Sequence, residues 1–159
     1  MSAEQAKLNY ARELENRTLE EVRAAGEAEW EEYLSRIDIE DKDEERKAVF
    51  YTCMYRAFLW PRKFHETDAE GKIRNLNLET GKPADGVLYV DNGFWDTYRT
   101  LYPYLSVIDT KLYAEMAEGY YHYYEDSGWL PKWLCPDNFN CMPGMLVEAT
   151  MADAVVKEI

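Results

Sequence analysis

Apolar residues recur at helical spacing through the first third of the chain. Residues 3–16 contain few helix breakers and predict a first helix. Thr18 and Glu21 match a capping box, which predicts the start of a second helix with its apolar side chains on one stripe. The acidic segment Asp41–Glu44 predicts a further helix start, and Pro61 is expected to stop that helix.

The rest of the chain mixes strand-like and helical segments. Residues 72–78 and 86–90 have alternating or β-branched character and flank a turn-rich stretch, which predicts one hairpin. Helical pattern resumes near Phe94, and Asp109 is expected to cap a longer helix. A proline-rich loop and a last helix follow. Five or six helices and one hairpin predict a mostly α fold with functional loops between its helices.

Composition and charge narrow the classes of partner. No repeat, low-complexity run or Gly/Ser linker marks a boundary, so residues 1–159 are expected to form a single segment. Lysine and arginine number 18 against 31 aspartate and glutamate residues, which gives a net charge of −13. Nucleic acids and anionic membrane surfaces require clustered basic side chains, so we expect neither as a partner.

The start of the chain lacks a basic region followed by an apolar run, so no signal peptide is visible. No stretch approaches the roughly 18 apolar residues that a membrane span needs. The three cysteines cannot all pair within the chain, and Cys135 and Cys141 do not have the spacing of a zinc site. We therefore expect a cytoplasmic protein with reduced thiols and no metal ligands among these residues.

The densest group of chemically useful side chains lies in residues 91–99. The turn residues that open this segment are explained by the start of a helix alone. Trp95 beside Asp96 is explained less well in this way. An indole face stacks on the C–H groups of a sugar, while a carboxylate accepts two hydrogen bonds from neighbouring hydroxyls. From chemistry alone, core packing stays open as the commoner alternative.

Other aromatic and titratable side chains have ordinary interpretations. Trp129 and Trp133 lie on a proline-broken loop, where packing beneath the loop is the commoner role. The Tyr120–Tyr124 run covers all faces of its helix, so some of these rings must be exposed or meet another helix. His65 and Glu66 could form an acid/base pair, although adjacency in sequence says little about whether they face each other.

Four ordered motifs resemble the glycoside hydrolase family 92 α-mannosidases, at similar spacing and over nearly the whole chain. These motifs are Phe50–Pro61, Gly93–Arg99, Gly128–Trp133 and Ala152–Lys157. The resemblance implies a catalytic domain built as an (α/α)6 toroid behind an N-terminal β-sandwich. It further implies exo-acting, calcium-dependent hydrolysis of α-1,2-type mannosides with inversion, and hence a mannose-containing glycan as the partner.

The resemblance also implies that this chain is an internal piece of the catalytic domain, because the toroid needs more helices than the five or six expected here. It implies that the β-sandwich precedes Met1, and that the general acid, the general base and the main calcium ligands follow Ile159. We therefore expect the chain alone to be catalytically inactive and to self-associate through toroid helices that are left uncovered.

Matching the motifs residue by residue implies substrate-binding roles and leaves the catalytic residues unassigned. Asp96 would hold hydroxyls of a terminal mannose, Trp95 would wall the pocket, and Arg99, one helical turn on, would orient Asp96. Trp133 and Asp153 lie in matching motifs and are also predicted to bind substrate. The alternative to this family function is a stand-alone helical module that binds sugar or protein without catalysis.

Overall fold

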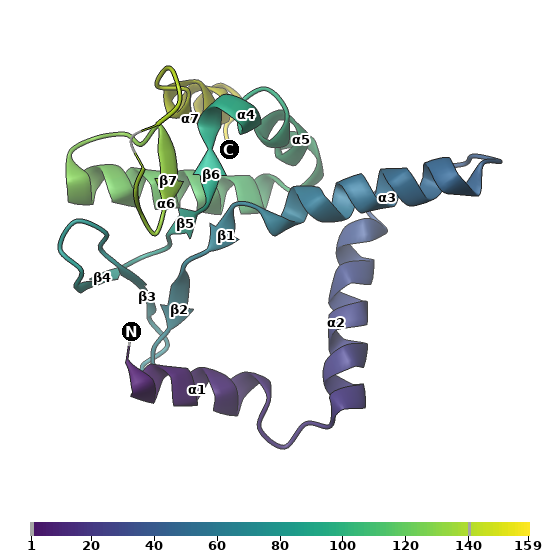
Figure 1. Cartoon of the computed structure of the whole chain (residues 1–159), viewed down its shortest axis with the longest axis horizontal. Coiled ribbons are helices and arrows are strands. Elements are labelled where there is room, and N and C mark those ends of the chain that lie inside the picture. Colours follow the sequence, from purple (N-terminus) through teal and green to yellow (C-terminus); the bar gives the residue numbers. More distant parts are fainter. Residues whose placement is uncertain (1, 140) are drawn as a thin grey trace. The chain divides into compact units, whose positions relative to one another are not determined.

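The computed structural model describes residues 2–139 and 141–159. The chain divides into two compact units, which we call the N-terminal unit (Ser2–Leu59) and the C-terminal unit (Trp60–Ile159). The described residues contain seven α-helices and eight short strands (Figure 1). The predicted dominance of helices is confirmed, although the sequence pattern indicated five or six helices and a single hairpin.

The N-terminal unit consists of three helices, which are α1 (Ala3–Glu13), α2 (Leu19–Leu34) and α3 (Glu44–Leu59). The predicted capping box is confirmed at the start of α2. The Glu21 amide donates to the Thr18 hydroxyl at 3.2 Å, and the Thr18 amide donates to the Glu21 carboxylate at 2.8 Å. The first helix is shorter than predicted, because Asn16 adopts the left-handed backbone region with φ of 63°.

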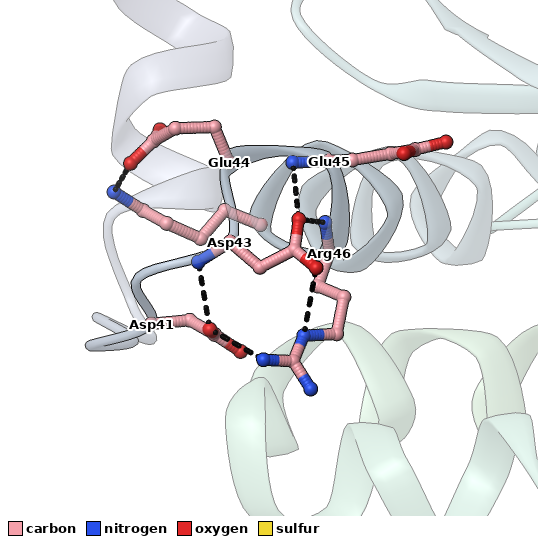
Figure 2. A network of polar contacts seen from close by, with 6 residues as sticks. Asp41, Asp43, Glu44, Glu45 and Arg46 are labelled. Atoms are coloured by element: carbon pink, nitrogen blue, oxygen red, sulfur yellow. Dashed lines mark hydrogen bonds and ion pairs between the residues drawn. The ribbon is translucent and has the colours of Figure 1, made fainter.

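Acidic side chains organise the start of α3 (Figure 2). The Asp43 carboxylate accepts hydrogen bonds from the amides of Glu45 at 3.0 Å and Arg46 at 3.2 Å. Asp41 accepts from the Asp43 amide at 2.9 Å and from the Arg46 guanidinium at 2.9 Å. The predicted position of this helix start is therefore correct, and the geometry assigns the capping side chain to Asp43.

Aromatic rings pack α2 against α3. The ring centroids of Trp30 and Tyr55 lie 4.3 Å apart, and those of Tyr33 and Phe58 lie 4.9 Å apart. The Arg36 guanidinium covers the Tyr33 ring at 4.5 Å from its centroid. Aromatic pairs of this kind contribute about 0.5–1.5 kcal/mol each beyond their area burial, so these rings stabilise the packing of the two helices.

The strands of the C-terminal unit form three small antiparallel sheets. In the first, β1 (Arg62–Lys63) pairs with β5 (Tyr89–Val90). The second has the order β2 (His65–Thr67), β3 (Ile73–Leu76) and β4 (Pro83–Asp85). The third has the order β6 (Asn92–Gly93), β7 (Trp133–Cys135) and β8 (Asp137–Asn138).

The predicted hairpin between residues 72–78 and 86–90 is wrong. β3 pairs with β4 on one side and with β2 on the other, whereas β5 pairs with β1. Gly86 separates β4 from β5 with φ of 97°, a conformation that other residues rarely adopt. The chain therefore turns away from β3 at the residue where the prediction placed its partner strand.

Four helices complete the C-terminal unit, which are α4 (Phe94–Thr97), α5 (Leu101–Ile108), α6 (Thr110–Ser127) and α7 (Val147–Val156). The predicted Asp109 cap of α6 is confirmed, since its carboxylate accepts from the Leu112 amide at 3.0 Å. Gly128 ends α6 in the left-handed region. α6 packs against α5, α7 and β5 (Figure 1). Within residues 2–139 and 141–159, no helix has the length and apolarity that a membrane crossing requires.

The largest fully buried side chains in the core of the C-terminal unit are tyrosines. Tyr102, Tyr113 and Tyr120 are fully buried, together with Phe94 and Leu134. The Tyr120–Tyr124 run divides as its helical spacing predicts: Tyr120 and Tyr123 are buried, whereas Tyr121 and Tyr124 are exposed. On the buried face of α6, Tyr120 contacts Phe94 of α4 and Asn92 of β6.

Candidate functional site

The pairing of β6 with β7 joins two segments that are far apart in sequence. Gly93 lies opposite Trp133 in this ladder. Trp95 and Asp96 follow directly after β6, on the short helix α4. The pairing of β6 with β7 therefore places Trp133 beside the start of α4, the helix that contains Trp95 and Asp96.

Gly93 leaves the space in which these side chains meet. A Cβ atom at this position would lie 2.4 Å from Nε1 and 2.7 Å from Cδ1 of Trp133, and 3.1 Å from Oδ2 of Asp96. The indole edge and the carboxylate therefore converge over the bare backbone of Gly93. The φ of Gly93 is −94°, which any residue adopts, so the missing side chain is what this position requires.

This cluster has the chemical groups that recognise a sugar. The Asp96 carboxylate accepts hydrogen bonds, and the Trp133 indole donates one through Nε1. Asp96 is exposed, and Trp95 is 41% exposed, so both are open to a ligand. A hydroxyl that donates to the carboxylate and a second hydroxyl that accepts from the indole match adjacent positions on a sugar ring, while aromatic surface packs on its C–H groups.

Arg99 contacts Trp95, and the expected contact with Asp96 is not found. Its guanidinium lies 4.7 Å from the Trp95 ring centroid and 4.8 Å from that of Tyr98. Nη2 of Arg99 also donates to the Trp95 carbonyl at 3.2 Å. The part of the chain that the structure describes contains no ion pair between Arg99 and Asp96. Arg99 therefore restrains the indole by covering one of its faces.

Asp153 lies in a separate cluster on α7. Its carboxylate accepts from Lys157 Nζ at 2.9 Å and from the Tyr113 hydroxyl at 3.3 Å, and Lys157 also donates to the Ser106 hydroxyl at 2.9 Å. Burial, with the nearby Asp153 carboxylate, raises the pKa of Tyr113 far above its usual value, so this hydroxyl remains a donor. These contacts tie α7 to α5 and α6, and among residues 2–139 and 141–159 no hydrogen bond joins Asp153 to Asp96.

Two residues that the sequence explains only as turn residues, Asp91 and Asn92, hold the segment in place. Asp91 precedes β6 with φ of 61° and forms an ion pair with Arg62, whose guanidinium lies 4.9 Å from the Trp60 ring centroid. Asn92 is 1% exposed and bonds within the tyrosine core. The sequence alone does not show that the Asn92 side chain is buried, because its burial depends on how α5 and α6 pack against it.

His65 and Glu66 do not form an acid/base pair. They are consecutive residues of β2, so their side chains point to opposite faces. Nδ1 of His65 accepts from the Leu88 amide at 3.1 Å, and Nε2 lies 3.5 Å from the Glu115 carboxylate. Burial lowers the pKa of His65, which keeps the ring neutral.

The calcium implied by the family resemblance has no candidate ligand set within the described part of the chain. Among the residues that the structure describes, no group of three or more His, Cys, Asp or Glu side chains could hold a metal ion. A cavity of about 500 Å³ lies in the N-terminal unit and contains none of the predicted site residues. It is lined by Glu31, Leu34, Ser35, Ile37, Asp38 and Tyr51.

Comparisons with known proteins indicate the same family as the four sequence motifs. The family model for the glycosyl hydrolase family 92 catalytic domain matches residues 5–159. The family GH92 inverting mannosidase BT2199 from Bacteroides thetaiotaomicron VPI-5482 is 31% identical, with a TM-score of 0.95 over 98% of this chain and 21% of that one. The family GH92 α-mannosidase BT3965 from Bacteroides thetaiotaomicron, in complex with mannoimidazole, is 31% identical, with a TM-score of 0.87 over 99% of this chain and 21% of that one.

A third solved structure, the GH92 family glycosyl hydrolase ccman5, has a TM-score of 0.78 at 23% identity over 100% of this chain and 22% of that one, and it supports the fold alone. No curated protein matched the sequence. The chain thus spans about a fifth of the length of the solved structures that it resembles.

Proposed function

Because the chain belongs to glycosyl hydrolase family 92, we propose that it supplies part of the mannose-binding site of an α-mannosidase. The observation that carries this proposal is the convergence of Trp133 and Asp96 over Gly93, next to an exposed Trp95. The names of the solved relatives support mannose as the sugar, since one of them is an α-mannosidase in complex with mannoimidazole.

Each side chain has a distinct part in the proposed site. Asp96 accepts hydrogen bonds from two sugar hydroxyls, and Trp133 donates to a third group through its indole N–H. Trp95 offers the face that Arg99 leaves open. Asp153, predicted from its motif to bind substrate, would act on the site through the placement of α7.

The reaction we propose is exo-hydrolysis of α-1,2-type mannosides with inversion. Inversion needs a general acid and a general base whose carboxyl groups stand roughly 6.5–9.5 Å apart to admit a water molecule. We assign neither role to this chain, and we expect it to bind mannose without cleaving a glycoside. In the same proposal its helices form part of an (α/α)6 toroid, and calcium is held by residues outside this chain.

Calorimetric titration of the full chain with methyl α-mannoside tests the proposed site. Asp96→Asn keeps the size of the side chain and removes its charge, and we expect roughly tenfold or greater loss of affinity, because hydrogen bonds to a charged group contribute about 1.5–3 kcal/mol. Asp126→Asn, at an exposed acid of α6, is the matched control and should bind as the parent chain does. Absence of binding by the parent chain would refute the site.

Exposed aromatic side chains support the further proposal of self-association. Trp129 is 73% exposed and Tyr121 is 50% exposed in the C-terminal unit. Soluble monomers rarely leave large contiguous apolar surfaces uncovered. Light scattering distinguishes this proposal from the stand-alone binding module: the module should be monodisperse and melt cooperatively, whereas the family piece should associate with rising concentration.

A further inference from the structure

A buried polar network begins at Asn92, the residue before Gly93 of the proposed sugar site. The Asn92 side chain is almost fully buried, and its amide donates to the Tyr102 hydroxyl at 2.6 Å and to the Tyr120 hydroxyl at 3.4 Å. The two tyrosine hydroxyls lie 2.8 Å apart. The Asn92 side-chain nitrogen is thus directed at the tyrosine pair in the core, and its carbonyl oxygen accepts from Thr97 of α4. Hydrogen bonds at both ends of a buried amide favour one orientation of its side chain.

Thr97 connects this network to the helix that carries Asp96. Its hydroxyl lies 2.9 Å from the Asn92 carbonyl oxygen and 3.1 Å from the Gly93 backbone carbonyl, and its one proton is shared between these two acceptors. Asp96 is the residue before Thr97, and Gly93 is the residue over which the Asp96 carboxylate lies. The hydroxyl therefore fixes the single turn of α4 against β6 at both ends of the segment that presents Asp96.

We propose that Thr97 and Asn92 are positioning residues, which hold the Asp96 carboxylate beside the indole N–H of Trp133. The identity of the ligand, an α-mannoside, rests on the proposed function. The placement of Asp96 rests on the geometry alone. The four-residue helix α4 has too few backbone hydrogen bonds to fix this placement by itself. Trp95 and Arg99 are exposed, and the hydrogen bonds of this link are made by Thr97, Asn92 and Gly93.

The ordinary alternative is that Thr97 only bonds back to the carbonyl four residues earlier, as threonines in helices commonly do. Such a bond has no effect outside its own turn. The second acceptor separates the two cases, because the Asn92 side chain that offers it is held through its nitrogen by the tyrosine pair of α5 and α6. Positioning therefore predicts that the loss of the Thr97 hydroxyl changes the surroundings of Trp133, whereas the local bond predicts a change in stability alone.

The experiment compares the full chain with Thr97→Val, Thr97→Ser and the control Thr110→Val, which alters an exposed threonine at the start of α6. Valine keeps the shape of threonine without its hydroxyl, and serine keeps the hydroxyl. The ligand-free readout is the ¹⁵N–¹H resonance of the Trp133 indole, identified by its loss in Trp133→Phe. The ligand readout is the dissociation constant for methyl α-mannoside by calorimetry.

We expect Thr97→Val to shift the Trp133 indole resonance and to weaken mannoside affinity by roughly tenfold, the value of one well-placed hydrogen bond. Thr97→Ser should restore both, and Thr110→Val should change neither. A valine variant that melts lower but keeps the parent's indole resonance overturns the positioning role, as does a serine variant that restores nothing. If the parent chain binds no mannoside, the proposed function fails, and the ligand-free resonance still decides for or against the positioning of Asp96.

Discussion

Adding one methyl group at Gly93 should disrupt the site by overpacking. In Gly93→Ala the new Cβ would stand 2.4 Å from Nε1 of Trp133, and the backbone φ of −94° is compatible with alanine, so the contact alone causes the effect. A normal contact needs about 3.5 Å, so the indole or the backbone must move by about 1 Å. Overpacking of this size costs about 1–3 kcal/mol in the free energy of unfolding.

Urea denaturation measures that cost, and the Trp133 indole resonance reports where the ring moves. Gly26→Ala is the matched control. A Cβ at Gly26, inside α2, meets nothing within 4 Å, so alanine should raise stability by about 0.5–1 kcal/mol through its helix preference. Because Asp96 lies 3.1 Å from the same point, we also expect Gly93→Ala to weaken mannoside binding. A Gly93→Ala chain with the parent's unfolding free energy and an unchanged indole resonance would refute the convergence of Trp133 and Asp96 over this residue.

Two further predictions concern stability. The free energy of unfolding should decline as the pH falls below about 6.5, because burial lowers the pKa of His65 in the folded chain while the unfolded chain takes up the proton at the usual value. The decline should level off once the pH passes the lowered pKa, and His65→Gln should flatten the urea-denaturation profile in this window; an unchanged slope would contradict the assignment. Asp109→Ala should cost about 1 kcal/mol by removing the cap of α6, and Asp109→Asn, which retains a capping oxygen, should recover most of it. Equal losses in both variants, by thermal melting, would show that charge rather than capping is responsible.

Local signals in the sequence predicted the helix ends well, and pairing between distant strands could not be predicted from them. Thr18 with Glu21, and Asp109 with Gly128, bond to backbone groups a few residues away, so their pattern is sufficient. The partner of β5 is instead β1, which follows Pro61 after a helix and carries no strand pattern of its own. Two-residue strands gain their pairing from the packing around them.

For the site residues too, the sequence indicates local features and misses contacts that depend on the folded structure. The chemistry of an indole beside a carboxylate marks Trp95 and Asp96, and a motif that resembles a known family adds Trp133. The structure brings Asp96 and Trp133 together. Arg99 was assigned to Asp96 from helical spacing alone. Helical spacing brings Arg99 equally within reach of the Trp95 ring and carbonyl. The Asp96 carboxylate lies over Gly93, and the Arg99 guanidinium covers the Trp95 indole.

The ladder between β6 and β7 also has a consequence for how the site forms during folding. Trp95 and Asp96 share one short stretch of chain, but Trp133 reaches them only after the intervening α5 and α6 have packed and returned the chain to Gly93. Such long-range contacts form late, because the loop between them must close first. A partly folded chain with its helices in place but β7 unpaired would lack Trp133 at the proposed site, so we expect mannoside binding to appear only when β7 pairs with β6.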